Sequence, residues 1–62
     1  MRQIRPAHTF QTAVRITKAQ RLLKQRVPSA WIAAQLGFAD QSHFIRTFRA
    51  WRHVTPSEFA GR

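Results

Sequence analysis

Residues 32–49 constrain the fold of this chain most strongly, because they combine the end of one helix, a turn and the start of another. Ile32, Ala33 and Leu36 have the i, i+1, i+4 spacing of one helix face. Gly37 follows, and glycine is the residue that ends a helix in the left-handed conformation without steric cost. We therefore expect the first helix of this segment to end at Gly37.

A second helix is expected to begin directly after Asp40, whose carboxylate suits the N-cap position. Its apolar residues recur at the 3.6-residue spacing of a helix that buries one face. They are Phe44, Ile45, Phe48 and Trp51. Phe38 is expected to fill the space between the two helices, where the small Ala33 allows a close approach. Two short helices joined by a turn that contains glycine form a helix-turn-helix.

A long helix is expected before this motif. It should cover residues 8–26, with Thr9 as its N-cap. Its apolar positions are Phe10, Val14, Ile16, Ala19, Leu22 and Leu23. Either Pro28 or Ser29 should then open the first helix of the motif, since proline suits the first helical position.

The C-terminal residues contain a strong helix-start signal. Thr55 suits the N-cap, Pro56 the first helical position and Glu58 the reciprocal position of a capping box. A short helix over residues 55–60 is therefore expected, with Phe59 anchoring it on the core.

The expected fold class is all-α, because neither strand alternation nor an internal repeat occurs in the sequence. Its 62 residues suit one small domain. We expect residues 1–7 to be a frayed lead-in and residues 8–62 to form one homeodomain-like helix-turn-helix domain. Its parts are the long helix (about 8–26), the helix-turn-helix (about 29–52) and the short helix (about 55–60).

The charge balance of the sequence points to a polyanionic partner. Eleven Lys and Arg oppose only Asp40 and Glu58, which gives a formal net charge of +9. Such a charge destabilises a compact state through self-repulsion unless nucleic acid or an anionic membrane relieves it. The absence of cysteine is consistent with a reducing cytoplasm, which is the expected location. No apolar run approaches the ~20 residues that span a membrane.

No catalytic arrangement is recognisable in the sequence. The serines lack a His–acid pair at a known spacing, no glycine-rich phosphate loop is present, and both acids occupy capping positions. His8, His43 and His53 do not share a helix face, so no metal site is expected. We expect a protein that is not an enzyme, without a cofactor, a metal or a small-molecule effector site.

Three blocks of the sequence, in order and correctly spaced, resemble the C-terminal end of the AraC/XylS family of transcriptional regulators. The first is Arg15-Ile16-x-x-Ala19-x-x-Leu22-Leu23. The second is Ile32-Ala33-x-x-Leu36-Gly37-Phe38-x-Asp40-Gln41-Ser42-x-Phe44-x-Arg46-x-Phe48-Arg49, and the third is Val54-Thr55-Pro56-Ser57-Glu58-Phe59. The resemblance covers roughly residues 6–59.

The resemblance implies a sequence-selective DNA-binding module of a transcriptional regulator. In that family a long helix joins two helix-turn-helix units, and this chain resembles the joining helix and the second unit, a half-domain. We expect the rest of the first unit and any effector-binding domain to lie outside the chain. Double-stranded DNA is the expected partner, and the candidate protein partners are RNA polymerase and a first half-domain.

Two positions depart from the family pattern. The family usually has glycine where this chain has His53, and commonly arginine where Ala60 follows Phe59. If His53 is left-handed, the lack of glycine costs roughly 1 kcal/mol. We expect both departures to affect stability and to leave the DNA-reading face intact.

The recognition helix, residues 41–52, is expected to enter the major groove with its N-terminal half against the bases. The resemblance assigns base contacts to Gln41, Ser42, His43 and Arg46. By its chemistry, Gln41 can pair bidentately with adenine, and Arg46 with guanine. Phosphate contacts are expected from Arg49, Thr47 and the backbone amides of the helix that Ser29 opens.

Two other functions remain open. The +9 charge and the long helix also fit a cationic amphipathic peptide on an anionic membrane surface. Such a peptide would have no use for the caps at Asp40 and Thr55. The third possibility is a truncated remnant that acts through protein–protein interaction. Trp31, expected to be partly exposed, either covers the end of the long helix or contacts such a partner.

Overall fold

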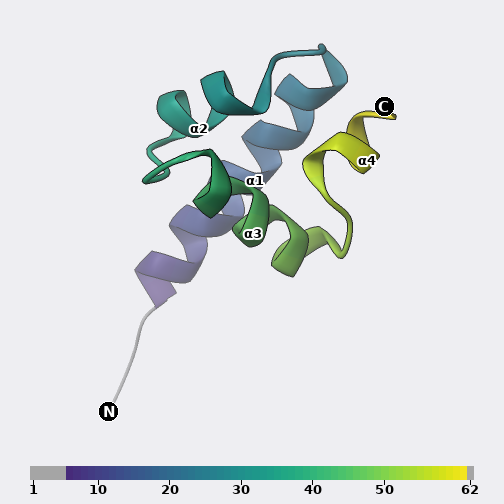
Figure 1. The fold of residues 1–62 in the computed structure, drawn as a ribbon. Helices are drawn as coiled ribbons and strands as arrows, with labels where there is room; N and C mark the ends of the chain where they lie inside the picture. The colour runs from purple at the N-terminus through teal and green to yellow at the C-terminus, as the bar shows by residue number, and fades with distance from the viewer. Residues whose placement is uncertain (1–5, 62) are drawn as a thin grey trace.

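Four helices form the fold of the computed structural model, which describes the backbone of residues 6–61 and the side chains of residues 10–61 (Figure 1). The helices are α1 (Pro6–Lys24), α2 (Ser29–Leu36), α3 (Gln41–Arg52) and α4 (Pro56–Ala60). Both α2 and α4 pack against α1, and α3 packs against α2 and α4. The described residues contain no strand, so the predicted all-α fold class is confirmed.

The long helix α1 begins earlier than the sequence indicated. Pro6 is its first residue, the position that proline favours. Thr9 lies inside α1 and is therefore not its N-cap, which corrects that prediction. Of the lead-in expected over residues 1–7, Pro6 and Ala7 belong to α1, and residues 1–5 lie outside the described residues.

The end of α1 is formed by a left-handed residue that is not glycine. Arg26 has a φ of +67°, and its N–H donates to the carbonyl of Leu23 at 3.0 Å. The N–H of Val27 donates to the carbonyl of Leu22 at 3.1 Å. These two bonds close the helix as in a Schellman motif, in which glycine usually occupies the left-handed position. Because arginine occupies this position, the sequence has no glycine that would indicate the end of the helix. The expected end was residue 26, whereas α1 ends at Lys24.

The turn between α2 and α3 forms as the sequence predicted. Gly37 has a φ of +85°, and both its N–H and that of Phe38 donate to the carbonyl of Ala33. Phe38 is buried, and Asp40 is the N-cap of α3. At the other end of α2, Pro28 is the N-cap and Ser29 the first helical residue.

The core lies between α1 and the other three helices. Its buried apolar residues are Ile16, Ala19, Leu23, Ile32, Ala33, Phe38, Phe44, Phe48 and Ala60. A row of aromatic rings crosses it, with centres 5.1 Å apart for Phe38–Phe44, 5.8 Å for Phe44–Phe48 and 5.5 Å for Phe48–Phe59. This row connects the helix-turn-helix to α4, since Phe59 belongs to α4.

Two residues expected in the core are exposed. Phe10 is 69% exposed, because the N-terminal turns of α1 extend past the helices that cover the rest of it (Figure 1). Trp51 is 40% exposed, in the last turn of α3. Trp31, for which partial exposure was expected, is 49% exposed on α2.

Short-range bonds fix α4. The Thr55 hydroxyl accepts the N–H of Glu58 at 3.1 Å, and the Glu58 carboxylate accepts the N–H of Thr55 at 2.9 Å. The predicted capping box is therefore confirmed. The helix ends at Gly61, whose φ is +85°.

Candidate nucleic-acid interface

One side of α3 packs in the core and the opposite side is exposed to solvent. Phe44 and Phe48 are fully buried, and Ile45 is half-buried beside them. At 100° per residue, the direction opposite these two rings is that of Ser42, Arg46 and Arg49. All three side chains are exposed. The helix therefore presents a hydroxyl and two guanidinium groups along one outward ridge.

The residues predicted to contact bases do not all lie on that ridge. Gln41, His43, Ser42 and Arg46 are all exposed, whereas Thr47, predicted to contact phosphate, is half-buried. By helical spacing His43 lies about 60° from Arg46, on one flank of the ridge, whereas Gln41 lies about 140° from Arg46, near the edge of the buried side of α3. The structure thus brings Ser42, Arg46 and Arg49 together and sets Gln41 apart from them.

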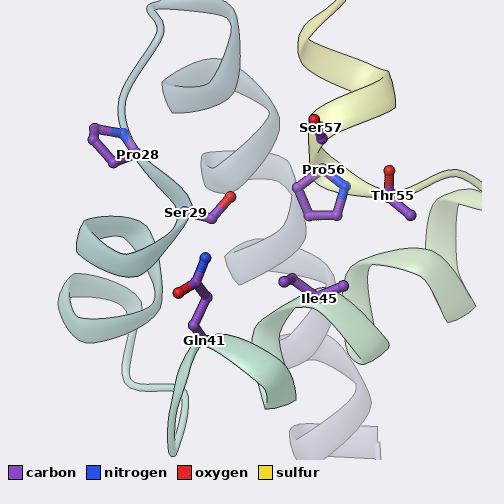
Figure 2. A pocket seen from close by; sticks show the side chains of 7 residues that line it. All are labelled: Pro28, Ser29, Gln41, Ile45, Thr55, Pro56 and Ser57. Atoms are coloured by element: carbon purple, nitrogen blue, oxygen red, sulfur yellow. The ribbon is translucent and has the colours of Figure 1, made fainter. Parts of the chain in front are cut away.

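Gln41 borders a hollow at the start of α2, α3 and α4 (Figure 2). The hollow is lined by Pro28, Ser29, Gln41, Ile45, Thr55, Pro56 and Ser57. Figure 2 shows the Gln41 side chain pointing toward Ser29. The hollow therefore joins a predicted base-contacting residue to a predicted phosphate-contacting one.

The start of α2 is suited to an anion. Pro28 is its N-cap and makes no side-chain hydrogen bond to the helix. The backbone N–H groups of a first helical turn carry partial positive charge and attract anions. At α4, in contrast, the Thr55 hydroxyl is already bonded within the capping box. Within the hollow, Ser29 is therefore better placed than Thr55 to meet an anion.

The electrostatics of this surface are dominated by cations. Arg46, Arg49 and Arg52 of α3 are all exposed. Each of the two acids bonds to a backbone N–H: Asp40 to that of His43, and Glu58 to that of Thr55. The Thr55 N–H and hydroxyl hold the pKa of Glu58 below its usual range, with a smaller contribution from Arg49.

His43 has a second structural role that the sequence analysis did not identify. Its ring Nδ1 accepts a hydrogen bond from the N–H of Ala39 at 3.2 Å. The ring also packs edge-on against Phe38, with centres 5.5 Å apart. His43 lies three residues after the N-cap, the position of the reciprocal acceptor in a capping box. This spacing is the sequence signal that could have indicated a role in capping.

The contact of Arg15 in α1 with the turn was also not predicted from the sequence. The Arg15 side chain is half-buried, and its guanidinium lies 6.0 Å from the centre of the Phe38 ring. Arg15 therefore contacts the turn of the helix-turn-helix from α1. The position of an arginine on a helical wheel gives no indication of such a contact, which depends on how α1 packs against the turn.

Among the side chains of residues 10–61, no group of three or more His, Cys, Asp or Glu is placed to hold a metal ion. Within residues 6–61, none of the helices combines the length and the apolar character needed to cross a membrane.

Comparison with known families gives a match over nearly the whole chain. The model of a helix-turn-helix domain family matches residues 4–62. No solved structure matches the chain. The match includes the joining helix α1, the buried side of α3 and the capped helix α4. The chain therefore belongs to the family of AraC-type helix-turn-helix domains, as a DNA-binding module of a transcription regulator.

Proposed function

We propose that this module binds DNA sequence-selectively, with α3 as a recognition helix in the major groove. The observation that carries the proposal is the outward ridge of Ser42, Arg46 and Arg49 on a helix whose other side is anchored by Phe44 and Phe48. An α-helix fits the width of the major groove, and a rigidly held one can keep its side chains in register with base edges.

The base contacts are assigned by position and chemistry. Arg46, in the middle of the ridge, can form two parallel hydrogen bonds to the O6 and N7 of guanine. Gln41 can pair in the same bidentate way with adenine, and Ser42 can donate or accept. His43 contributes one ring nitrogen from the flank. The N-terminal half of α3 thus carries every proposed base contact.

The phosphate contacts surround these bases. Arg49 extends the ridge toward the C-terminal half of α3, and Thr47 adds a hydroxyl at its flank. On the other side of the recognition helix, Ser29 and the backbone N–H groups of α2 can bind a second phosphate. Contacts on both sides would fix the orientation of α3 in the groove.

The module is proposed to work as a half-domain. A single module of this kind buries about 600–1,000 Å² on DNA, so useful specificity normally needs a second one. A first helix-turn-helix half-domain and RNA polymerase are the proposed protein partners. The proposed location is the cytoplasm, and no enzymatic reaction is proposed because both carboxylates of the chain cap helices.

A second candidate function is protein–protein interaction, in which the chain pairs with a longer relative and modulates it. The observation that favours it is the exposure of Phe10 and Trp31, since large apolar side chains on a surface often mark interaction sites. Size-exclusion chromatography of the chain, alone and mixed with a full-length relative, would show a dimer or a mixed complex.

A titration with random-sequence duplex pools tests the main proposal. Neutralisation of about five or six phosphates should make log K fall against log salt with a slope near −5. Selection from the pool should also enrich one sequence. The Gly37→Val variant has the same charge and a disrupted turn, so it serves as the control that should bind without enriching any sequence. A flat salt response would remove DNA binding and favour the interaction hypothesis.

A further inference from the structure

The imidazole of His43 is held in one orientation at the start of α3. Its backbone N–H donates to the Asp40 carboxylate at 2.7 Å, and its ring Nδ1 accepts the N–H of Ala39 at 3.2 Å. The ring packs edge-on against Phe38 at an interplanar angle of 74°. His43 is therefore bonded both to the N-cap Asp40 and to Ala39, the residue before it, an arrangement similar to a capping box but with the N–H of the preceding residue as the donor to the imidazole.

This hydrogen bond determines the tautomer of the ring. A neutral imidazole has one N–H donor and one acceptor nitrogen. Because Nδ1 accepts from Ala39, the proton is on Nε2. His43 is exposed, and its Nε2–H is the polar group of the side chain that is left for a partner. The side chain can therefore offer a donor to the groove and not an acceptor.

We propose that His43 reads a base edge as a donor only. In the major groove, guanine and thymine present acceptors, adenine presents both the N7 acceptor and the N6 amino donor, and cytosine presents only the N4 amino donor. The base that faces His43 is therefore one that offers an acceptor. Cytosine is excluded at that position, because its amino group and the Nε2–H of His43 are both donors. This inference rests on the proposed insertion of α3 into the major groove, and it adds the hydrogen-bonding polarity of one contact.

The first experiment tests the bond to Ala39 without DNA. Amide hydrogen exchange at Ala39 should be about 3- to 10-fold faster in His43→Ala than in the unchanged chain, because its acceptor is lost. The His53 amide, which bonds to the Arg49 carbonyl at 2.7 Å at the other end of α3, is the reference. Its exchange should not change. Equal exchange of Ala39 in both proteins would overturn the inference.

The second experiment tests the polarity of the contact by selection from random duplex pools. In His43→Gln, the amide oxygen can accept from Ala39 and the amide NH₂ can face the groove. Cytosine should therefore remain excluded at one position of the selected sequences. In His43→Glu, one carboxylate oxygen can accept from Ala39 and the other is an acceptor. Cytosine, whose edge presents only a donor, should therefore become favoured at that position, where the unchanged chain excludes it. The readout is base preference, which the added negative charge of glutamate does not mimic.

Two outcomes separate this inference from the proposed function. If the unchanged chain enriches no sequence while Ala39 stays protected, sequence-selective binding fails, and the DNA contact of His43 fails with it. If a sequence is enriched but His43→Glu weakens binding without altering any base preference, selective binding stands and the inference alone is wrong. In that case His43 contacts a phosphate.

Discussion

The guanidinium of Arg15 lies 6.0 Å from the centre of the Phe38 ring, which connects the long helix α1 to the turn between α2 and α3. The same guanidinium borders Gly37, since a Cβ placed on Gly37 would lie 3.5 Å from an Arg15 nitrogen. The turn that positions the recognition helix therefore rests on a cation from α1. This relationship suggests a reason why α1 and the helix-turn-helix occur together in one module.

Arg15→Ala should lower the free energy of unfolding by about 0.5–1 kcal/mol, the size of a partly exposed cation–π contact. Urea denaturation followed by circular dichroism measures the change. Lys18→Ala is the matched control, because it removes the same charge from an exposed position of α1. An equal effect of the two substitutions would show that the contact with Phe38 contributes no stability.

Gly37→Ala should destabilise the chain by about 1–2 kcal/mol, because a residue with a Cβ is strained at a φ of +85°. Gly37→Val should unfold it or nearly so, since a β-branched residue is an outlier there. Space does not explain the loss, because the added Cβ would make only an ordinary contact. Gly61→Ala, at the same φ near the chain end, should change the melting temperature much less. A native-like melting temperature for Gly37→Val would refute the role of this turn.

His53→Gly should stabilise the chain by roughly 0.5–1 kcal/mol, because His53 ends α3 at a φ of +67°, a conformation that glycine adopts more readily. Arg26→Gly, also at +67°, should act in the same direction. Thermal melts of both variants provide the measurement. A clear loss of stability in both would mean that the side chains contribute more than the backbone strain costs.

The turn, the N-caps of α3 and α4, and α4 itself could be predicted from the sequence because they depend on short-range bonds. Gly37, Asp40 and the pair Thr55–Glu58 form their hydrogen bonds within a few residues, so the spacing of residue types is sufficient. The end of α1 could not be predicted in this way. Arg26 takes a left-handed conformation that its residue type does not favour.

The exposure of particular residues was harder to predict than their spacing. Phe10 and Trp51 have the positions of buried residues on a helical wheel, but burial requires another element above them. No other helix fully covers Phe10 near the N-terminal end of α1 or Trp51 in the last turn of α3. For the candidate interface, the outward direction of Arg46 follows from the apolar stripe. The spacing of His43 from Asp40 indicates a role in capping, but the choice of Ala39 as the donor depends on the backbone path before the helix.

Acid should weaken α4 through Glu58. Hydrogen bonds from the Thr55 N–H and hydroxyl lower the pKa of its carboxyl below the ordinary value of 4.5. A group with a lowered folded-state pKa stabilises the fold above its unfolded-state pKa, and this contribution is lost as the pH falls through the folded-state pKa. The pH dependence of the unfolding free energy should therefore be shallower in acid for Glu58→Gln, which bonds similarly without ionising. Identical acid profiles for the two proteins would contradict the assignment.

The central claim is that α3 reads bases and does not merely hold phosphates, and substitution of Arg46 tests it most directly. A guanidinium can form two parallel hydrogen bonds to guanine, whereas the ammonium of lysine is a point charge that cannot reproduce that geometry. Gel-shift titrations on the selected sequence and on random duplex measure the difference. Arg21→Lys, an exposed position of α1, is the control that should alter neither.

Arg46→Lys should lose about 1–3 kcal/mol on the selected sequence and almost nothing on random duplex. Arg46→Ala should likewise weaken the selected sequence more than random DNA. If Arg46→Ala instead weakens both by the same factor, Arg46 contacts only phosphate, and base recognition by the centre of this helix is contradicted.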